Sequence, residues 1–148
     1  MNLEQKVMAQ LKEAMKAKDQ LKMEALRAIK SAILLEKTKG GQKELSEADE
    51  MKLLQKLVKQ RKESADIYLQ QNRKDLAEVE LKQAEVIEAF LPEQMSEEEI
   101  ENEVKKIIAE TGASSMRDMG KVMGIATKKM AGRADGKMIS GIVKKLLS

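Results

Sequence analysis

The chain has 148 residues, of which 42% are hydrophobic and 36% are charged, a composition typical of soluble folded proteins rather than of disordered chains. It contains no Cys and no His, which excludes disulfides, thiolate nucleophiles, imidazole bases and ordinary zinc or haem sites. The net charge of +3 is too small by itself to indicate a nucleic-acid partner.

Four helices are predicted in residues 1–92. Apolar residues at helical spacing run from Leu3 to Met15, and Asp19 is expected to cap a second helix that ends at Gly40-Gly41. Ser46 with Asp49 resembles a capping box before a third helix, and the pattern lapses around residues 71–73 before a fourth. The expected apolar positions of the last three helices are Met23, Leu26, Ile29 and Ile33, then Met51, Leu54, Val58, Ala65 and Tyr68, then Leu76, Val79, Val86 and Phe90.

A second domain is predicted from residue 93 to residue 148. Pro92 is the only proline, and six of the eight glycines follow residue 111. Ser96 with Glu99 forms a capping box, Gly112 ends the helix behind it, and Asp135 caps the last helix. Between them, Met116, Met119, Met123, Ala126 and Met130 keep helical spacing. The predicted fold is therefore all-α, with an N-terminal four-helix bundle over 1–92 and a smaller three-helix bundle over 93–148.

Charge is unevenly distributed along the chain. Residues 112–148 carry eight Lys or Arg and two Asp, whereas residues 93–111 carry two Lys and seven Glu. A phosphate-binding surface would produce this pattern, and so would two domains that pack together through opposite charge.

No constellation of residues predicts catalysis. The chain has no Gly-x-Ser-x-Gly, and a serine nucleophile would have no His to activate it. Residues 132–137 faintly resemble a P-loop but are one residue short and lack Ser or Thr after Lys137. We therefore expect no catalytic residue, no cofactor and no metal site.

The Gly-rich turn over residues 132–137 has two interpretations. Gly132 and Gly136 would let backbone N–H groups approach a phosphate, with charge from Arg133 and Lys137. Alternatively the turn only separates two helices, with Asp135 occupying the helix end, and the residues alone favour this simpler interpretation. The candidate phosphate-binding residues are Lys121, Lys128, Lys129, Gly132, Arg133, Gly136 and Lys137.

Three further features each allow a structural and a functional interpretation. Gly120 and Gly124 lie within one helix, where close packing of a neighbouring helix is the favoured reason and approach of RNA or a partner chain the alternative. Met116, Met119, Met123 and Met130 are interpreted as core rather than as an adaptable interaction face. Arg61 falls on an apolar stripe, where we favour a buried stem with a solvated head over a functional arginine in a groove.

Four ordered motifs resemble the GatB/YqeY family, over essentially the whole chain in its stand-alone YqeY members. They are Leu91-Pro92-Glu93-Gln94-Met95-Ser96-Glu97-Glu98, Thr111-Gly112-Ala113-Ser114-Ser115, Asp118-Met119-Gly120-Lys121-Val122-Met123-Gly124 and Gly132-Arg133-Ala134-Asp135-Gly136-Lys137. The C-terminal half is also similar to the tail domain of the GatB component of glutamyl/aspartyl-tRNA amidotransferase. The resemblance implies a four-plus-three helix arrangement and a link to glutamine-dependent tRNA amidation, in which the tail is the part associated with holding tRNA. Those tails tend to have Pro where this chain has Gly136.

We therefore expect a non-catalytic helper that binds tRNA or another structured RNA, with a protein–protein adaptor as the alternative. A helix-turn-helix DNA reader is disfavoured because the last two helices lack an Arg/Asn/Gln cluster for base edges. No apolar run reaches the length of a membrane span, and the N-terminal residues read as a helix rather than a signal peptide. These features predict a cytoplasmic protein without a membrane partner.

Overall fold

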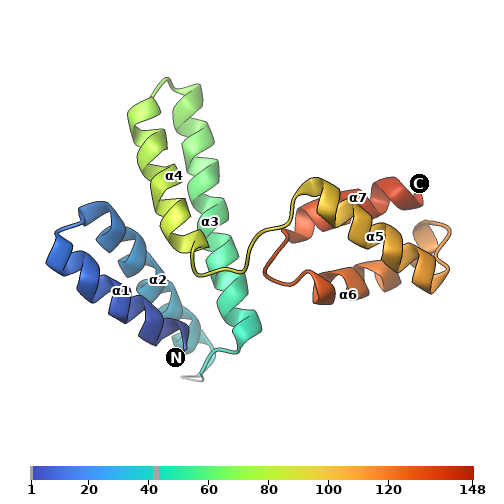
Figure 1. Ribbon diagram of the computed structural model, residues 1–148, viewed down its shortest axis with the longest axis horizontal. Coiled ribbons are helices and arrows are strands. Elements are labelled where there is room, and N and C mark those ends of the chain that lie inside the picture. The colour runs from blue at the N-terminus through green and yellow to red at the C-terminus, as the bar shows by residue number, and fades with distance from the viewer. Residues whose placement is uncertain (1, 42–43) are drawn as a thin grey trace. The chain divides into compact units, whose positions relative to one another are not determined.

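The computed structural model describes residues 2–41 and 44–148, and within them the chain forms α-helices, one short 3₁₀ turn and no strand (Figure 1). The predicted all-α class is confirmed. The helices fall into two compact units, Met1–Leu91 and Pro92–Ser148.

The first unit consists of two helical hairpins. Helices α1 (Leu3–Ala17) and α2 (Gln20–Lys39) form one hairpin, and α3 (Glu47–Gln70) and α4 (Lys74–Glu88) form a second, with α2 packed against α4 (Figure 1). Both hairpins contribute to one aliphatic core. Its fully buried large side chains are Val7, Leu26, Ile29, Leu54 and Ile87.

Two helix starts of the first unit follow the predicted caps. The carboxylate of Asp19 accepts a hydrogen bond from the Lys22 N–H, and Ser46 and Asp49 form a complete reciprocal capping box. Lys18 and Asn72 adopt positive φ angles of 56° and 59°. These left-handed residues reverse the chain within a few positions, which is why both hairpins have short connections.

The second unit is a three-helix bundle of α5 (Glu97–Thr111), α6 (Met119–Lys129) and α7 (Gly136–Leu147), with the 3₁₀ turn η1 (Met116–Asp118) before α6. The Ser96–Glu99 capping box forms as predicted, and Gly112 ends α5 with a φ of 70°. The separate core of this unit contains Ile100, Val104, Ile107, Val122, Met130, Ile139 and Val143.

Several expected apolar positions are not in the core. Val79 of α4 is exposed, whereas its neighbour Ala77 is buried together with Ala65 of α3 and Ala84. Because these alanines let α3 and α4 approach closely, the seam between the helices follows the small residues and turns Val79 outward. Met116 is exposed in the 3₁₀ turn rather than placed on a helix, so the core interpretation is wrong for Met116. It holds for Met130, which is fully buried, and for Met119 and Met123, which are partly buried against the same core.

Candidate functional site

The turn between α6 and α7 is built into the second unit by backbone hydrogen bonds. Gly132 is buried with a φ of 76°, a conformation that other residues rarely adopt. Its carbonyl accepts a hydrogen bond of 2.7 Å from the Gln94 side-chain amide, and the Arg133 carbonyl accepts one of 2.8 Å from the Met95 N–H. The carbonyls of the turn therefore hold the segment that precedes α5, a structural use of Gly132.

The N-terminus of α7 already carries a carboxylate. Asp135 is its cap, and its Oδ1 accepts the Lys137 N–H at 3.4 Å. An anion bound at this helix end would have to share the position with that charge. The predicted capping role of Asp135 is confirmed, and the geometry favours the simpler interpretation of the turn.

Lys129 does not belong with the free cations of the predicted site. Its ammonium lies 4.0 Å from the Glu103 carboxylate and 3.8 Å from the Glu110 carboxylate, both on α5. Arg133 donates from Nη2 to the Lys129 carbonyl at 3.2 Å, across the end of α6. Lys129 therefore links α6 to the acidic helix of the bundle, and Arg133 satisfies a carbonyl at the end of α6.

The other cations lie on the solvent sides of α6 and α7. Lys121 and Lys128 are exposed and seven residues apart on α6, which puts them on one stripe about 10 Å apart. Lys137 and Lys144 repeat this arrangement on α7. We call these four lysines the α6–α7 lysine face.

The carboxylates of residues 112–148 do not neutralise this face. Asp118 accepts the Ser114 N–H at 3.0 Å, and Asp135 caps α7. Within the second unit, no carboxylate lies within 4.0 Å of any cation of residues 112–148 except Lys129. Seven cations of this segment therefore lack an ion pair within the described second unit: Arg117, Lys121, Lys128, Arg133, Lys137, Lys144 and Lys145.

The packing interpretation of Gly120 and Gly124 is wrong. Both glycines are exposed, and a Cβ built on either would meet no atom within 4 Å. Among the described residues, no neighbouring helix approaches them. They leave a strip of bare backbone on the solvent side of α6, close to Lys121 and Lys128.

Arg61 lies on α3, in the first unit. Its side chain is half-buried between the buried Val58 and Ala65, and its Nε is shielded from solvent with no hydrogen-bond partner among the described residues. A ligand oxygen could not reach this shielded Nε without rearrangement. The arrangement fits a stem packed along the helix seam.

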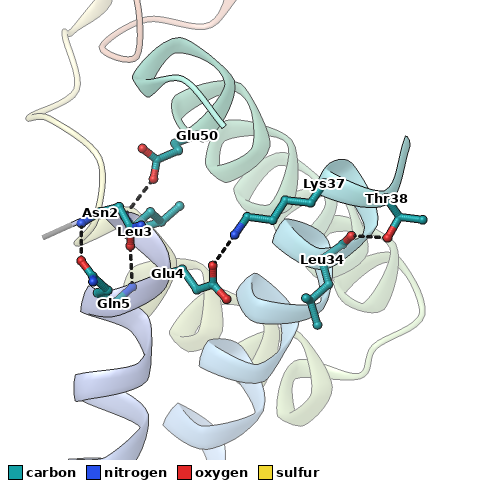
Figure 2. A network of polar contacts seen from close by, with 8 residues as sticks. All are labelled: Asn2, Leu3, Glu4, Gln5, Leu34, Lys37, Thr38 and Glu50. Atoms are coloured by element: carbon teal, nitrogen blue, oxygen red, sulfur yellow. Dashed lines mark hydrogen bonds and ion pairs between the residues drawn. The ribbon is translucent and has the colours of Figure 1, made fainter. Parts of the chain in front are cut away.

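A second polar cluster joins three helix ends of the first unit and was not foreseen from the sequence. The Lys37 ammonium contacts the Glu4 carboxylate at 2.6 Å, and the Leu3 N–H donates to the Glu50 carboxylate at 2.9 Å (Figure 2). The hydrogen bond to Glu4 raises the pKa of Lys37 above its ordinary value. No local pattern could have indicated these pairs, because the partners lie 33 and 47 residues apart in the sequence.

Two other kinds of feature are absent from the described residues. No three His, Cys, Asp or Glu side chains gather in a way that could hold a metal ion. None of the described helices combines the length and the apolar character needed to cross a membrane.

Comparison with known proteins gives one family over nearly the whole chain. The model of the family described as Yqey-like protein matches residues 4–147. Similar curated proteins are called "Altered inheritance of mitochondria protein 41, mitochondrial". Those of Clavispora lusitaniae and Lachancea thermotolerans are 37% and 36% identical to this chain over 70% and 71% of it. The protein of Vanderwaltozyma polyspora is 32% identical over 91% of this chain and 77% of its own length.

The first two matches span only 61% and 57% of the relatives' own length. The relatives' names describe them as mitochondrial, which contradicts the prediction of a cytoplasmic protein. That prediction rested on the lack of a membrane-spanning run and of a signal peptide in the sequence, and neither observation identifies a compartment.

Proposed function

The chain belongs to the Yqey-like protein family, and we propose that it is a non-catalytic module that binds the phosphate backbone of structured RNA, such as tRNA, through the α6–α7 lysine face. The proposal rests on one observation, that most cations of residues 112–148 have no carboxylate partner among the described residues of their unit. Seven cations of residues 112–148 have no ion pair within the described second unit, while both carboxylates of the segment accept backbone N–H groups. A surface of unpaired lysines attracts a polyanion and gains from counterion release.

The residue types favour a phosphate ligand over bases. Lysine is a point charge suited to phosphate, whereas base edges are read mainly by Arg, Asn and Gln. The chain contains only Tyr68 and Phe90 as aromatics, so it offers no platform on which single-stranded bases could stack. Double-stranded RNA, which is recognised by its shape and its phosphates, fits such a surface best.

Two further features support the proposal. The bare backbone at Gly120 and Gly124 lets a phosphate chain approach α6 more closely than side chains would allow. The motifs of residues 91–137 resemble the amidotransferase tail domain, which is associated with holding tRNA. We propose that the link to tRNA amidation is a role in binding RNA rather than in the amidation reaction.

The proposal is tested by reversing the charge of lysines on the α6–α7 lysine face and measuring how RNA affinity depends on salt concentration. We expect the double variant Lys121→Glu, Lys128→Glu to bind unmodified tRNA transcript more weakly than the parent protein. The slope of log K against log salt should flatten by roughly 0.7–0.9 for each phosphate that is no longer neutralised, hence for about two phosphates. Fluorescence anisotropy over a series of salt concentrations measures both quantities, and circular dichroism checks that helicity is retained.

The matched control reverses two lysines on the acidic helix of the same unit, Lys105→Glu and Lys106→Glu. It changes the net charge by the same amount but leaves the α6–α7 lysine face intact, so its salt slope should equal that of the parent protein. The proposal fails if the parent does not bind at low salt, or if the slope falls equally in both double variants. Either result would favour the alternative, a protein adaptor without an RNA ligand.

A further inference from the structure

The α1–α2 hairpin of the first unit exposes large apolar side chains. Met8 and Met15 of α1 are 42% and 52% exposed, and Leu34 of α2 is 50% exposed. They are separate from the buried stripe of α1, which contains Leu3, Val7, Leu11 and Ala14.

Helical spacing puts these side chains on one flank of the hairpin. Met8 follows Glu4 by one turn, and Leu34 precedes Lys37 by one turn, so both lie beside the Glu4–Lys37 ion pair that Figure 2 shows. Lys30 and Met23 precede Lys37 at intervals of seven residues along α2, which keeps them on the same side. Met8, Met15 and Leu34 are thus exposed along the seam between the two helices.

Three cations border this seam. Lys12 and Arg27 are exposed, Lys30 is half-buried, and among the described residues none of them has a carboxylate within 4.0 Å. Two other exposed cations of this hairpin do have such neighbours, since Lys16 lies 3.9 Å from Glu13 and Lys39 lies 3.9 Å from Glu36, whereas no carboxylate of the described residues lies within 4.0 Å of Lys6 or Lys18. We call Met8, Met15, Leu34, Lys12, Arg27 and Lys30 together the hairpin flank.

We propose that the hairpin flank docks an amphipathic helix of a partner protein, with apolar residues on the face that contacts Met8, Met15 and Leu34 and with acidic residues beside them. The seam between two antiparallel helices accepts a third helix through anchors spaced i, i+3 and i+7. The three cations without an ion pair are complementary in charge to acidic residues flanking the apolar face of the incoming helix. Methionine side chains adapt to different apolar anchors, which suits a docking surface.

The composition of the flank and of α5 disfavours other occupants. The acidic helix α5 of a second copy could not fill the seam, because its apolar residues Ile100, Val104 and Ile107 are already buried in its own bundle. Helices that lie on an anionic lipid surface typically carry Trp, Phe and Leu on their apolar face. The flank has no aromatic residue, and its apolar side chains are only about half exposed.

Titration of the full chain with a peptide, monitored by NMR of methyl-labelled methionines, tests the proposal. The probe is a helical peptide of about 14 residues with leucines spaced i, i+3 and i+7 and glutamates beside them. We expect the methyl signals of Met8, Met15 and Met23 to shift with saturation below about 1 mM, and those of Met116 and Met138 to stay in place. A peptide with lysines in place of the glutamates should leave all signals unchanged.

A pair of charge variants makes the test specific. Lys12→Glu with Lys30→Glu should weaken peptide binding by about tenfold at low salt, and the loss should shrink at high salt. The control Lys6→Glu with Lys39→Glu reverses two charges on the same helices but away from the flank, and should bind like the parent. Absence of shifts up to about 1 mM, equal effects of the two variants, or shifts of these methyl groups with phosphatidylglycerol vesicles but not with the acidic peptide would each overturn the proposal.

Discussion

At the scale of single residues, the Glu4–Lys37 pair fastens the end of α2 to the start of α1. Glu4 lies in the first turn of α1 and Lys37 in the last turn of α2, so each charge also interacts favourably with its helix dipole. Glu50 accepts the Leu3 N–H, one of the backbone donors that α1 cannot satisfy internally. Three helix ends are thus joined by two contacts.

The Glu4–Lys37 pair should stabilise the folded protein at neutral pH and lose this effect at alkaline pH. The pKa of Lys37 is raised in the folded protein, chiefly by the hydrogen bond to Glu4, so the charged form stabilises the fold. The contribution is complete below the ordinary pKa of 10.5 and is lost as pH rises through the folded value. We expect the variant Lys37→Met to melt below the parent at about pH 8, and the difference in melting temperature to shrink above pH 10.5.

The variant Lys39→Met serves as the control for that experiment. Lys39 lies two residues away on the same helix, in a weaker and more exposed pair with Glu36 at 3.9 Å. Its melting temperature should differ little from that of the parent across the same pH range. A difference for Lys37→Met that stays constant through the alkaline limb would show that lost packing, rather than the ion pair, causes the effect.

At the scale of secondary-structure elements, α6 contains a glycine that the backbone does not require, whereas the turn after it contains one that the backbone does require. Gly124 has an ordinary helical conformation and open space around its Cα, whereas Gly132 after the helix has a φ of 76°. We expect Gly124→Ala to stabilise the second unit by about 0.5–1 kcal/mol. Gly132→Ala should destabilise it by about 1–2 kcal/mol, because alanine is strained in the left-handed region.

Urea denaturation of both variants measures these two opposite changes in the free energy of unfolding. The result also bears on the proposed function, because alanine at position 124 covers part of the bare backbone beside the α6–α7 lysine face. A variant that is more stable than the parent but binds tRNA less tightly would indicate that α6 is glycine-rich for close approach of a ligand. Unchanged binding would confine RNA contact to the lysines.

The helix ends could be predicted from sequence because they depend on neighbouring residues. Asp19, Ser46, Ser96 and Asp135 each cap a helix as expected, since an Asp or Ser side chain satisfies an N–H only two or three positions away. The outward position of Val79 and the pairing of Lys129 with Glu103 could not be predicted in this way. Both depend on which helix lies alongside, and periodicity within one helix does not contain that information.

The candidate site was predictable in composition but not in geometry. The excess of lysines after residue 112 is visible in the sequence, whereas the separation of paired Lys129 from unpaired Lys128 needs the position of α5. The same limit applies to Gly120 and Gly124. A glycine pair within a helix indicates that something approaches closely, and only the neighbours in space show that this is not another helix of the described bundle.

At the scale of the whole molecule, the net charge of +3 conceals strong local separation. Residues 93–111 have a net charge of −5, and residues 112–148 have a net charge of +6. Because α5 packs against α6 and α7, the second unit carries opposite charges on different helices. Such a unit orients in the field of a polyanion, with α6 and α7 toward it and α5 away from it.

The boundary predicted near Pro92 leads to a calorimetric expectation. Each unit has its own aliphatic core, with Leu91 packed on the first and Met95 on the second. The larger unit should be the more stable, because a 57-residue unit buries a smaller share of its surface than a 91-residue unit. We therefore expect the full chain to unfold in two calorimetric transitions. Separately expressed fragments 1–91 and 92–148 should each be helical, and each should melt near one of those two transitions. A single transition with equal calorimetric and van't Hoff enthalpies, or a fragment 92–148 without helix, would mean that the two halves fold as one cooperative domain.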